Sequence, residues 1–303
     1  MNHYLNESES LILSYTSSRA PNELTVVLDG KYFMRGYQYY PWMSLLSHLS
    51  FSSLALTEDP FDWAYGLEEI GFTGWEIVSE GKQTLTDETM ARVEDILETT
   101  NLQLSLHLPF SDLNLASLNV HIWEETLRQQ IEYMERAAPF IEVAVVHPGH
   151  LSPLSIQLPD LAWEKNLEGI GRLCETGADL GVVICVENMV NMKFIFGRHA
   201  SEIVGMIETI DADNLAIVFD IGHANTNDMI NDFIGLKEKI RHVHAHDNHG
   251  ERDEHLPIGA GTIDWRHVAR ELSGFKGRTI LECRSVGDGK KSMTYLQNIV
   301  TSD

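Results

Sequence analysis

The sequence is poor in cysteine and has no long apolar run, and each shortage excludes a class of protein. The three cysteines, Cys174, Cys185 and Cys283, show no CxxC spacing, which excludes a disulfide-stapled secreted scaffold and favours reduced thiols. No apolar stretch approaches the length of a membrane-spanning helix, and the start MNHYLNESES lacks the basic and apolar regions of a signal peptide. We therefore expect a cytoplasmic protein with no membrane partner.

Basic residues are also scarce, because 22 Lys and Arg stand against 45 Asp and Glu, giving a formal net charge of -23. Such a surface repels polyanions, and no Lys/Arg cluster of the kind that grips a phosphate backbone is evident. Nucleic acid is therefore an unlikely partner. The remaining composition, 43% hydrophobic and 22% charged, is typical of a globular protein with enough apolar material for a large core.

Apolar runs of strand length alternate with longer amphipathic segments eight times from about residue 49. This alternation is typical of a parallel sheet with crossover helices, and eight such strands close a single α/β barrel, the (β/α)8 TIM barrel. The predicted strands are 49–56, 74–79, 102–108, 142–147, 182–187, 215–220, 240–246 and 278–284. The predicted helices are 60–70, 86–100, 119–138, 160–180, 200–210, 227–238, 264–273 and 290–301, with start signals at Thr86, Ser201 and Asp264.

Residues 1–47 precede the first predicted strand and form a short N-terminal extension to a barrel domain over residues 48–303. The aromatic-rich stretch KYFMRGYQYYPW in this extension could close the bottom of the barrel, lie against its outer helices, or belong to a flexible arm. The sequence does not decide among these three alternatives. It also leaves the oligomeric state open, so that a homo-oligomer remains an alternative.

Most of the predicted strands change from apolar residues to acidic residues or histidine at their carboxyl ends. Parallel strands of a barrel converge there, so side chains that are far apart in the sequence can share one divalent cation. Any single residue is as readily a satisfied polar group at a strand end, but the repetition over several strands favours a metal site. The residues are His107, His147, Glu187, Asp220, His223, His244, Asp253, His255 and Glu282.

Four of these residues end the fifth to eighth predicted strands and are the predicted metal ligands: Glu187, Asp220, His244 and Glu282. Three carboxylates with one imidazole suit Mn²⁺, Zn²⁺, Co²⁺ or Mg²⁺ and are too acidic for a closed structural zinc site, so we expect a catalytic role. The other five are predicted to bind additional metal, to bind substrate or to orient the first four ligands: His107, His147, His223, Asp253 and His255.

Several neighbours of these residues are weaker candidates. Arg284 could hold a phosphate or sugar oxygen with its guanidinium group, and His223 could hold another substrate oxygen. His242 and His246 alternate with His244 along one predicted strand, and we expect neither to be a ligand. Glu80, just past the second strand, is more readily a solvated loop acid than a site residue.

Seven strings of the sequence together resemble the xylose isomerase-like barrel superfamily, from about residue 49 to the C-terminus: HLPFSDLN, VVHPGH, VENMVN, DIGHAN, HVHAHDN, RDEHLPIGAGTIDW and ILECR. The resemblance implies one TIM-type barrel with a divalent metal at its carboxyl-terminal face. The superfamily includes sugar and sugar-phosphate isomerases and epimerases as well as endonuclease IV. The epimerase branch implies metal ligands at Glu187, Asp220, His244 and Glu282, and an additional acid/base role for Glu187 and Glu282.

The endonuclease IV branch is the alternative. It has a trinuclear zinc site whose ligands carry over onto all nine residues given above, which implies an abasic-site phosphodiesterase. The charge of -23, the lack of a basic or wedge-inserting loop, and Cys-Arg-Ser after Glu282 in place of that branch's Thr-Pro favour the small-molecule branch. We therefore predict a metal-dependent isomerase of carbohydrate metabolism. Its substrate would be a sugar, sugar phosphate or polyol-derived compound, with proton transfer next to a metal-bound carbonyl.

Overall fold

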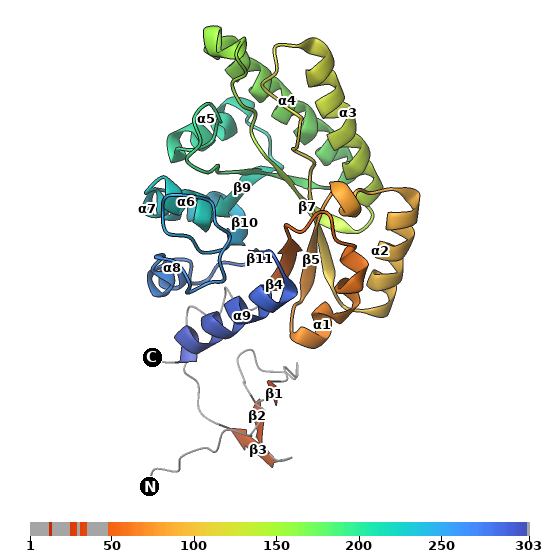
Figure 1. Ribbon diagram of the computed structural model, residues 1–303, viewed down its shortest axis with the longest axis vertical. Coiled ribbons are helices and arrows are strands. Elements are labelled where there is room, and N and C mark those ends of the chain that lie inside the picture. The colour runs from red at the N-terminus through yellow and green to blue at the C-terminus, as the bar shows by residue number, and fades with distance from the viewer. Residues whose placement is uncertain (1–11, 14–24, 29–30, 35–47, 302–303) are drawn as a thin grey trace. The chain divides into compact units, whose positions relative to one another are not determined.

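Eight parallel strands form a closed barrel in the computed structural model, which describes residues 12–13, 25–28, 31–34 and 48–301 (Figure 1). The strand order is β10-β11-β4-β5-β6-β7-β8-β9, and β11 pairs with β4 so that the first and last barrel strands are neighbours. The strands are β4 (Leu49–Ser53), β5 (Gly74–Val78), β6 (Gln103–His107), β7 (Ile141–Val146), β8 (Val183–Glu187), β9 (Leu215–Asp220), β10 (Ile240–Ala245) and β11 (Arg278–Cys283). Each overlaps its predicted range, which confirms the TIM barrel.

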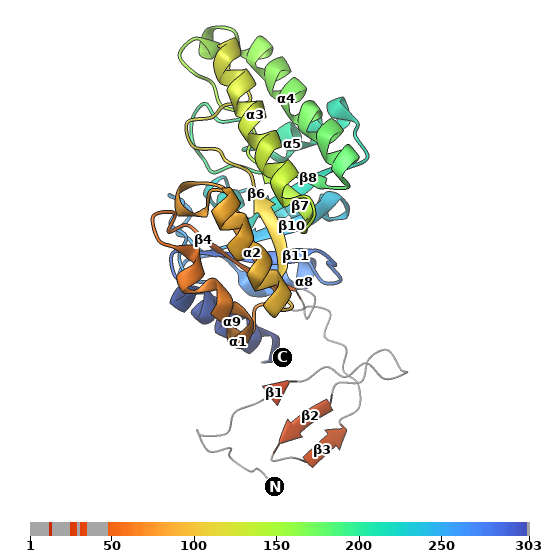
Figure 2. The ribbon, with the colours of Figure 1, turned by 90° about the vertical axis from the view of Figure 1, so that its right-hand side faces the viewer.

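Helices surround the barrel and connect its strands, and α3 and α4 pack side by side (Figure 2). The longer ones are α2 (Asp87–Thr99), α3 (Val120–Ala137), α4 (Pro159–Leu180), α5 (Ala200–Ile210), α8 (Trp265–Glu271) and α9 (Val286–Thr301). Two predicted caps are confirmed, since Thr86 Oγ1 accepts from the Thr89 N–H at 3.1 Å and Asp264 Oδ1 accepts from the His267 N–H at 3.0 Å. The predicted helix 200–210 is confirmed as α5, but its N-cap is His199 and not the start signal at Ser201.

Three predicted helices differ from the structure. The segment 60–70 forms two 3₁₀ turns (Pro60–Asp62, Ala64–Gly66) before the short α1 (Leu67–Ile70), consistent with the weak helix propensity of Gly66. The segment 227–238 overlaps only the short α7 (Ile230–Ile234) and a 3₁₀ turn (Lys237–Lys239); α6 (Ile221–Thr226) precedes it, and Asp228 has a left-handed φ of 56° between the two α-helices. Helix α9 begins at Val286 and not at 290, because Ser285 Oγ accepts from the Asp288 N–H at 3.2 Å. Two further 3₁₀ turns occupy Gly81–Gln83 and Ser155–Gln157.

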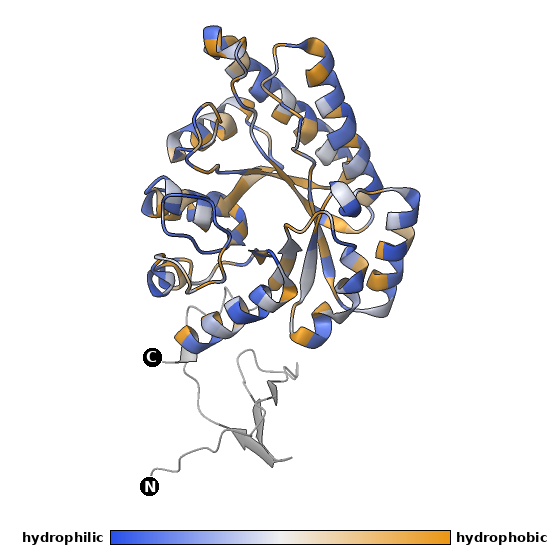
Figure 3. Cartoon of the chain, in the orientation of Figure 1, coloured by the Kyte–Doolittle hydropathy of each residue, from blue (hydrophilic) through white to orange (hydrophobic). Residues whose placement is uncertain are grey.

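The barrel strands bury side chains on both faces, and Figure 3 shows hydrophobic strands surrounded by helices with mixed hydropathy. The outward face joins the main core between strands and helices, where Trp75 packs edge-on against Phe61 and Trp63. The inward face contains a smaller apolar cluster of Val145, Cys185, Ala216 and Val218. Burial raises the pKa of the Cys185 thiol to about 12, so this residue fills the core as an uncharged group.

The first part of the chain, up to Pro41, is a separate compact unit. Its described residues form an antiparallel sheet of β1 (Ile12–Leu13), β2 (Thr25–Leu28) and β3 (Lys31–Met34). Most of the predicted extension 1–47 lies outside the described residues, and its role stays a prediction. Within the part of the chain that the structure describes, no helix combines the length and hydrophobicity required to cross a membrane.

Candidate metal centre

The nine acidic and histidine residues predicted from the sequence are all at the carboxyl-terminal mouth of the barrel. His107, Glu187 and Asp220 are the last residues of their strands, and His147 follows β7 directly. His244 and Glu282 each precede the last residue of β10 and β11. The remaining three come from connecting segments: His223 in α6, and Asp253 and His255 in the loop between β10 and α8.

Glu187 contacts four histidines. Its Oε1 lies 3.1 Å from Nδ1 of His244 and 3.5 Å from Nδ1 of His223. Its Oε2 lies 3.1 Å from Nε2 of His147 and 3.4 Å from Nε2 of His107. Burial by itself raises the pKa of the Glu187 carboxyl, but the imidazoles of His244 and His147 hold this pKa well below its usual range. Glu187 is therefore ionised at neutral pH.

Four residues form what we call the central set: Glu187, Asp220, His244 and Glu282. The Nδ1 atom of His244 faces all three carboxylates, at 3.1 Å from Glu187 Oε1, 3.2 Å from Glu282 Oε1 and 3.9 Å from Asp220 Oδ2. The four residues come from four consecutive strands, since β9 and β10 separate β8 from β11 around the barrel. Glu187 and Glu282 therefore reach the same imidazole nitrogen from the two strands that flank β9 and β10.

Glu76 lies in the middle of β5, deeper in the barrel than the strand ends, and contacts His244. It was not identified from the sequence as a site residue. Its Oε1 lies 3.0 Å from Nε2 of His244, and its Oε2 lies 2.7 Å from Nε2 of His242. Ser105 Oγ donates to the same carboxylate at 2.8 Å. A carboxylate at the far nitrogen of an imidazole fixes its tautomer and orientation, which leaves Nδ1 of His244 available as a metal donor.

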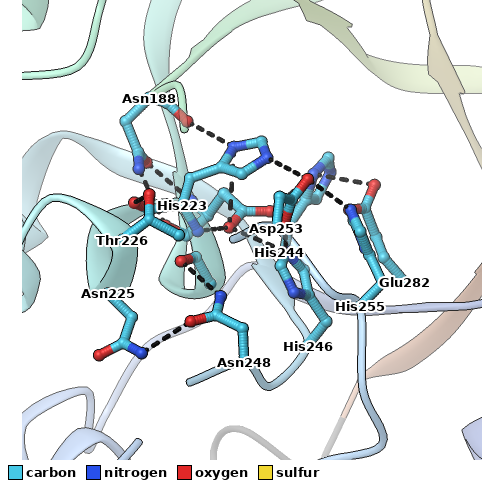
Figure 4. A network of polar contacts seen from close by, with 12 residues as sticks. Asn188, His223, Asn225, Thr226, His244, His246, Asn248, Asp253, His255 and Glu282 are labelled. Atoms are coloured by element: carbon cyan, nitrogen blue, oxygen red, sulfur yellow. Dashed lines mark hydrogen bonds and ion pairs between the residues drawn. The ribbon is translucent and has the colours of Figure 1, made fainter. Parts of the chain in front are cut away.

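A second group, here called the outer set, consists of His223, His246, Asp253 and His255 (Figure 4). Asp253 Oδ2 lies 2.8 Å from Nε2 of His255 and 3.4 Å from Nε2 of His223, while its Oδ1 lies 3.5 Å from Nε2 of His246. His246 Nε2 also lies 3.3 Å from Asp220 Oδ1, which connects the outer and central sets. The structure thus brings His246 among the donor atoms, whereas its place on the predicted strand indicated no ligand role.

Backbone carbonyls orient two of the imidazoles toward the site. Nδ1 of His223 is 2.8 Å from the carbonyl oxygen of Asn188, and Nδ1 of His107 is 2.9 Å from the carbonyl oxygen of Leu108. The N–H on Nδ1 donates the hydrogen bond in both contacts, so Nε2 is the nitrogen of each ring that is left to bind a metal ion. The Asn188 side chain also bonds the backbone of Asp220, accepting from its N–H at 2.8 Å and donating to its carbonyl at 2.9 Å.

Glu80 belongs to none of the candidate donor groups. Its Oε1 accepts from the backbone N–H groups of Phe110 and Ser111 at 2.6 and 2.5 Å, so it holds the loop after β6. The Phe110 ring in this loop lies 4.5 Å from the ring of His147. Arg284 is exposed just beyond β11, and its substrate-binding role stays a prediction.

The chemistry of these donors fits a metal ion. Seven polar atoms of the central and outer sets are buried and make no hydrogen bond: Glu187 Oε2, Asp220 Oδ2, His244 Nε2, His246 Nδ1 and Nε2, Asp253 Oδ1 and His255 Nδ1. Leaving a buried polar atom unsatisfied costs about 1–3 kcal/mol, and a cation bound among these atoms would remove that cost. Within the described residues, donor atoms close enough to share one ion occur in the groups His107/His147/Glu187, Glu187/Asp220/His244, Asp220/His246/Glu282, Glu76/His242/His244 and the outer set.

Metal binding is expected to release protons. Burial lowers the pKa of His223 and His244, but the facing carboxylates outweigh burial and raise both pKa values well above the usual range. Both rings are therefore imidazolium ions at pH 7 in the metal-free protein, with a proton on each nitrogen. A metal ion must displace one of these protons to bind the ring. Calorimetric titration with Zn²⁺ in buffers of different ionisation enthalpy should show this release and weaker binding at pH 6 than at pH 8.

The same pKa shifts predict a pH-dependent stability of the metal-free protein. Because the folded-state pKa values are raised, the imidazolium–carboxylate pairs stabilise the fold fully below the unfolded pKa of about 6.5. That stabilisation is lost as the pH rises through the raised values. The melting temperature of the metal-free protein should therefore fall above neutral pH.

In the calorimetric titration, Zn²⁺ binding without proton release, together with equal affinity at pH 6 and pH 8, would contradict the assignment of charged rings.

The fold and the cluster define a class: a (β/α)8 barrel with an acidic and histidine-rich centre at its carboxyl-terminal mouth. A family model described as a xylose isomerase-like TIM barrel matches residues 65–299, and the chain belongs to this family. An uncharacterized protein of Methanocaldococcus jannaschii is 34% identical over 238 residues, covering 76% of this chain and 81% of that protein.

Two similar proteins have more informative names. The crystal structure of a D-tagatose 3-epimerase-like protein is 32% identical, covers 84% of this chain and 97% of that one, and superposes with a TM-score of 0.79. Fructoselysine 3-epimerase of Shigella flexneri is 21% identical over 231 residues, covering 71% of this chain and 81% of that enzyme.

Proposed function

We propose that this protein is a sugar isomerase or epimerase that depends on a divalent cation, Mn²⁺, Zn²⁺, Co²⁺ or Mg²⁺, held by the central set. One observation carries the proposal: the Glu187 and Glu282 carboxylates lie 3.1 and 3.2 Å from the same nitrogen of His244. They come from strands separated by two others around the barrel. The 3-epimerase names of two relatives support the same reaction class.

A divalent cation in the central set would polarise a bound carbonyl group and make the neighbouring C–H acidic. The low pKa of Glu187 keeps it ionised and able to accept that proton. Glu282 on the other side would return a proton to the opposite face of the carbon, which inverts its configuration. Return by the same glutamate to the adjacent carbon, with the hydroxyl proton passing from one substrate oxygen to the other, would instead give an aldose–ketose isomerisation.

Additional residues beside the central set would position the substrate. A cavity of about 160 Å³ next to His147 is lined by Phe110, Asn114 and Gln130 among others. Gln130 Oε1 is buried and makes no hydrogen bond, so it is available to a substrate hydroxyl. We assign to His223 and Arg284 the binding of other substrate oxygens, and a small polyhydroxylated carbonyl compound matches this mixture of aromatic and polar groups.

The test of this function is a screen of ketoses, inososes and sugar phosphates in D₂O with the metal-loaded protein. Proton transfer through a carboxylate at an open mouth should place solvent deuterium on the carbon next to the carbonyl, which NMR detects. The chelated protein is the control and should show no turnover. A product without deuterium at any carbon, under prompt quenching with substrate in excess, would show that a hydride shift and not proton transfer operates.

Phosphodiester hydrolysis is the second candidate, favoured by the observation that all nine predicted donors are linked through shared carboxylates of Glu187, Asp220, Asp253 and Glu282. The same screen therefore includes an abasic DNA duplex at physiological salt. The net charge of -23 opposes DNA binding, so incision should be absent or slow. Efficient incision at low enzyme concentration would place the nuclease first.

A further inference from the structure

A groove next to the metal centre is lined by residues that have no role in the proposed function. It has a volume of about 430 Å³, and its walls include the apolar Phe194, Ile195 and Phe196 and the charged Lys193, Arg198 and Glu202. Ile195 also lines the cavity of about 160 Å³ beside His147, so the groove and this cavity adjoin. A substrate held at the metal centre could therefore extend past Ile195 into the groove.

Backbone pairing between two loops fixes the shape of the groove. The Leu151 N–H donates to the carbonyl oxygen of Phe194 at 2.6 Å, and the Phe196 N–H donates to the carbonyl oxygen of Gly149 at 3.1 Å. Phe194 is held at a left-handed φ of 72°, a conformation that is unfavourable for a bulky residue. Its side chain is 49% exposed, so the loop keeps an aromatic ring where a ligand can cover it.

The charge of the groove is unusual for this protein. Arg198 Nε is buried and makes no hydrogen bond, and no acidic side chain of the described residues forms an ion pair with Arg198. Glu202 does not neutralise it, because its carboxylate accepts from the His199 N–H at 3.1 Å in the capping box of α5. Lys193 adds a second positive charge in a chain where basic residues are scarce. A buried guanidinium N–H without an acceptor is costly, and an oxyanion is its strongest partner.

We propose that the groove binds the distal end of the substrate, an apolar stem that ends in an oxyanion, either a carboxylate or a phosphate. The stem packs on the rings of Phe194 and Phe196, and the oxyanion accepts hydrogen bonds from Arg198 beside the charge of Lys193. This inference rests on the proposed function and names its substrate class: a sugar that carries an acidic substituent, in place of a free monosaccharide. Arg198 then determines specificity and takes no part in proton transfer.

The first experiment measures binding without turnover. Calorimetric titration of the full-length protein uses phenyl phosphate and 3-phenylpropionate as probes, which join an aromatic stem to the two candidate oxyanions. At least one probe should bind more tightly than inorganic phosphate and benzyl alcohol, and the tighter probe identifies the oxyanion. Arg198→Gln should weaken it at least about tenfold, because the substitution removes the charge and the fork of N–H donors. Arg252→Gln is the matched control, since Arg252 is exposed in another loop of the mouth.

A second variant tests the apolar wall and serves if Arg198→Gln folds poorly. Phe194→Gly removes the ring, and glycine adopts a positive φ without strain, so the loop should keep its fold. This variant should weaken the aromatic probe and leave the affinity for inorganic phosphate as it is in the wild type. Probe binding that disappears when the metal is chelated would place the anion on the metal ion and overturn the proposal. Equal weakening by Arg198→Gln and Arg252→Gln would also overturn it.

The last experiment compares turnover of neutral ketoses with turnover of ketoses that carry a carboxyalkyl or phosphoalkyl chain. The wild type should favour the acidic compound, and Arg198→Gln should lower the ratio of kcat/KM for the acidic to the neutral compound at least about tenfold, mainly through KM. Arg252→Gln should keep the wild-type ratio. A ratio that Arg198→Gln does not change would overturn the proposal. Arg198-dependent probe binding without turnover of any sugar would instead contradict the proposed function and support the groove as an anion site.

Discussion

Glu187→Ala is expected to lose nearly all metal bound by the central set while the barrel stays folded. Glu187 contacts His244 and His223 through one oxygen and His147 and His107 through the other, so its removal takes a donor from two candidate groups at once. The barrel core is apolar and independent of these donors, which is why folding should persist. Elemental analysis would give the metal per chain, and circular dichroism would report the fold.

Asp220→Ala should give the same loss of metal, because Asp220 belongs to both carboxylate groups around His244 and His246. The matched control is Glu254→Ala, which removes an acidic residue of the mouth loop whose side chain is hydrogen-bonded to the exposed His249. This control should retain metal as the wild type does. Full metal retention in both Glu187→Ala and Asp220→Ala would show that the central set is not the metal site.

The barrel and the gathering of the nine candidate residues at its mouth could be predicted because both depend on local patterns. Most strand ends are marked by an apolar run that turns polar, and convergence of parallel strands then places these ends together without additional information. Helix starts at Thr86 and Asp264 were predictable for the same reason, since a cap is a contact between near neighbours in the sequence.

Glu76 and His246 could not be predicted because their environments are created by distant segments. Glu76 is in the middle of an apolar strand. Only closure of the barrel brings its carboxylate 3.0 Å from His244, which is far from Glu76 in the sequence. His246 follows the last residue of β10, where the strand pattern no longer tells which way a side chain points. Its inward position depends on the missing side chain of Gly222, in α6.

Asp220 shows how one residue can serve two roles that the sequence presents as alternatives. Its Oδ1 accepts from the His223 N–H at 2.6 Å and caps α6, a helix that begins earlier than the predicted segment 227–238. Its Oδ2 is buried, makes no hydrogen bond and lies 3.9 Å from Nδ1 of His244. The cap fixes the carboxylate and also places His223 one turn away, so local helix geometry positions two of the site residues together.

Glu282→Gln is expected to reduce turnover by a factor of about 10²–10⁴, the usual contribution of a positioned acid or base. Glutamine keeps the shape of the side chain and one oxygen for the contact with His244, so much of the metal should remain bound, unlike in Glu187→Ala. The amide cannot act as an acid or a base, however, and the substitution also removes one negative charge from the central set. Steady-state kinetics on the substrate identified by the screen would measure the loss, and elemental analysis would measure the metal.

Proton exchange without turnover separates the role of Glu282 in proton transfer from its role as a ligand. If Glu187 serves one face of the carbon and Glu282 the other, Glu282→Gln should still exchange the C–H of one epimer with D₂O without converting it. Glu187→Gln should exchange only the other epimer. The double variant should lose little more than the worse single variant, because both groups act on one reaction. Equal loss of exchange from both epimers in Glu282→Gln, with metal still bound, would mean that Glu282 is not the second proton-transfer group.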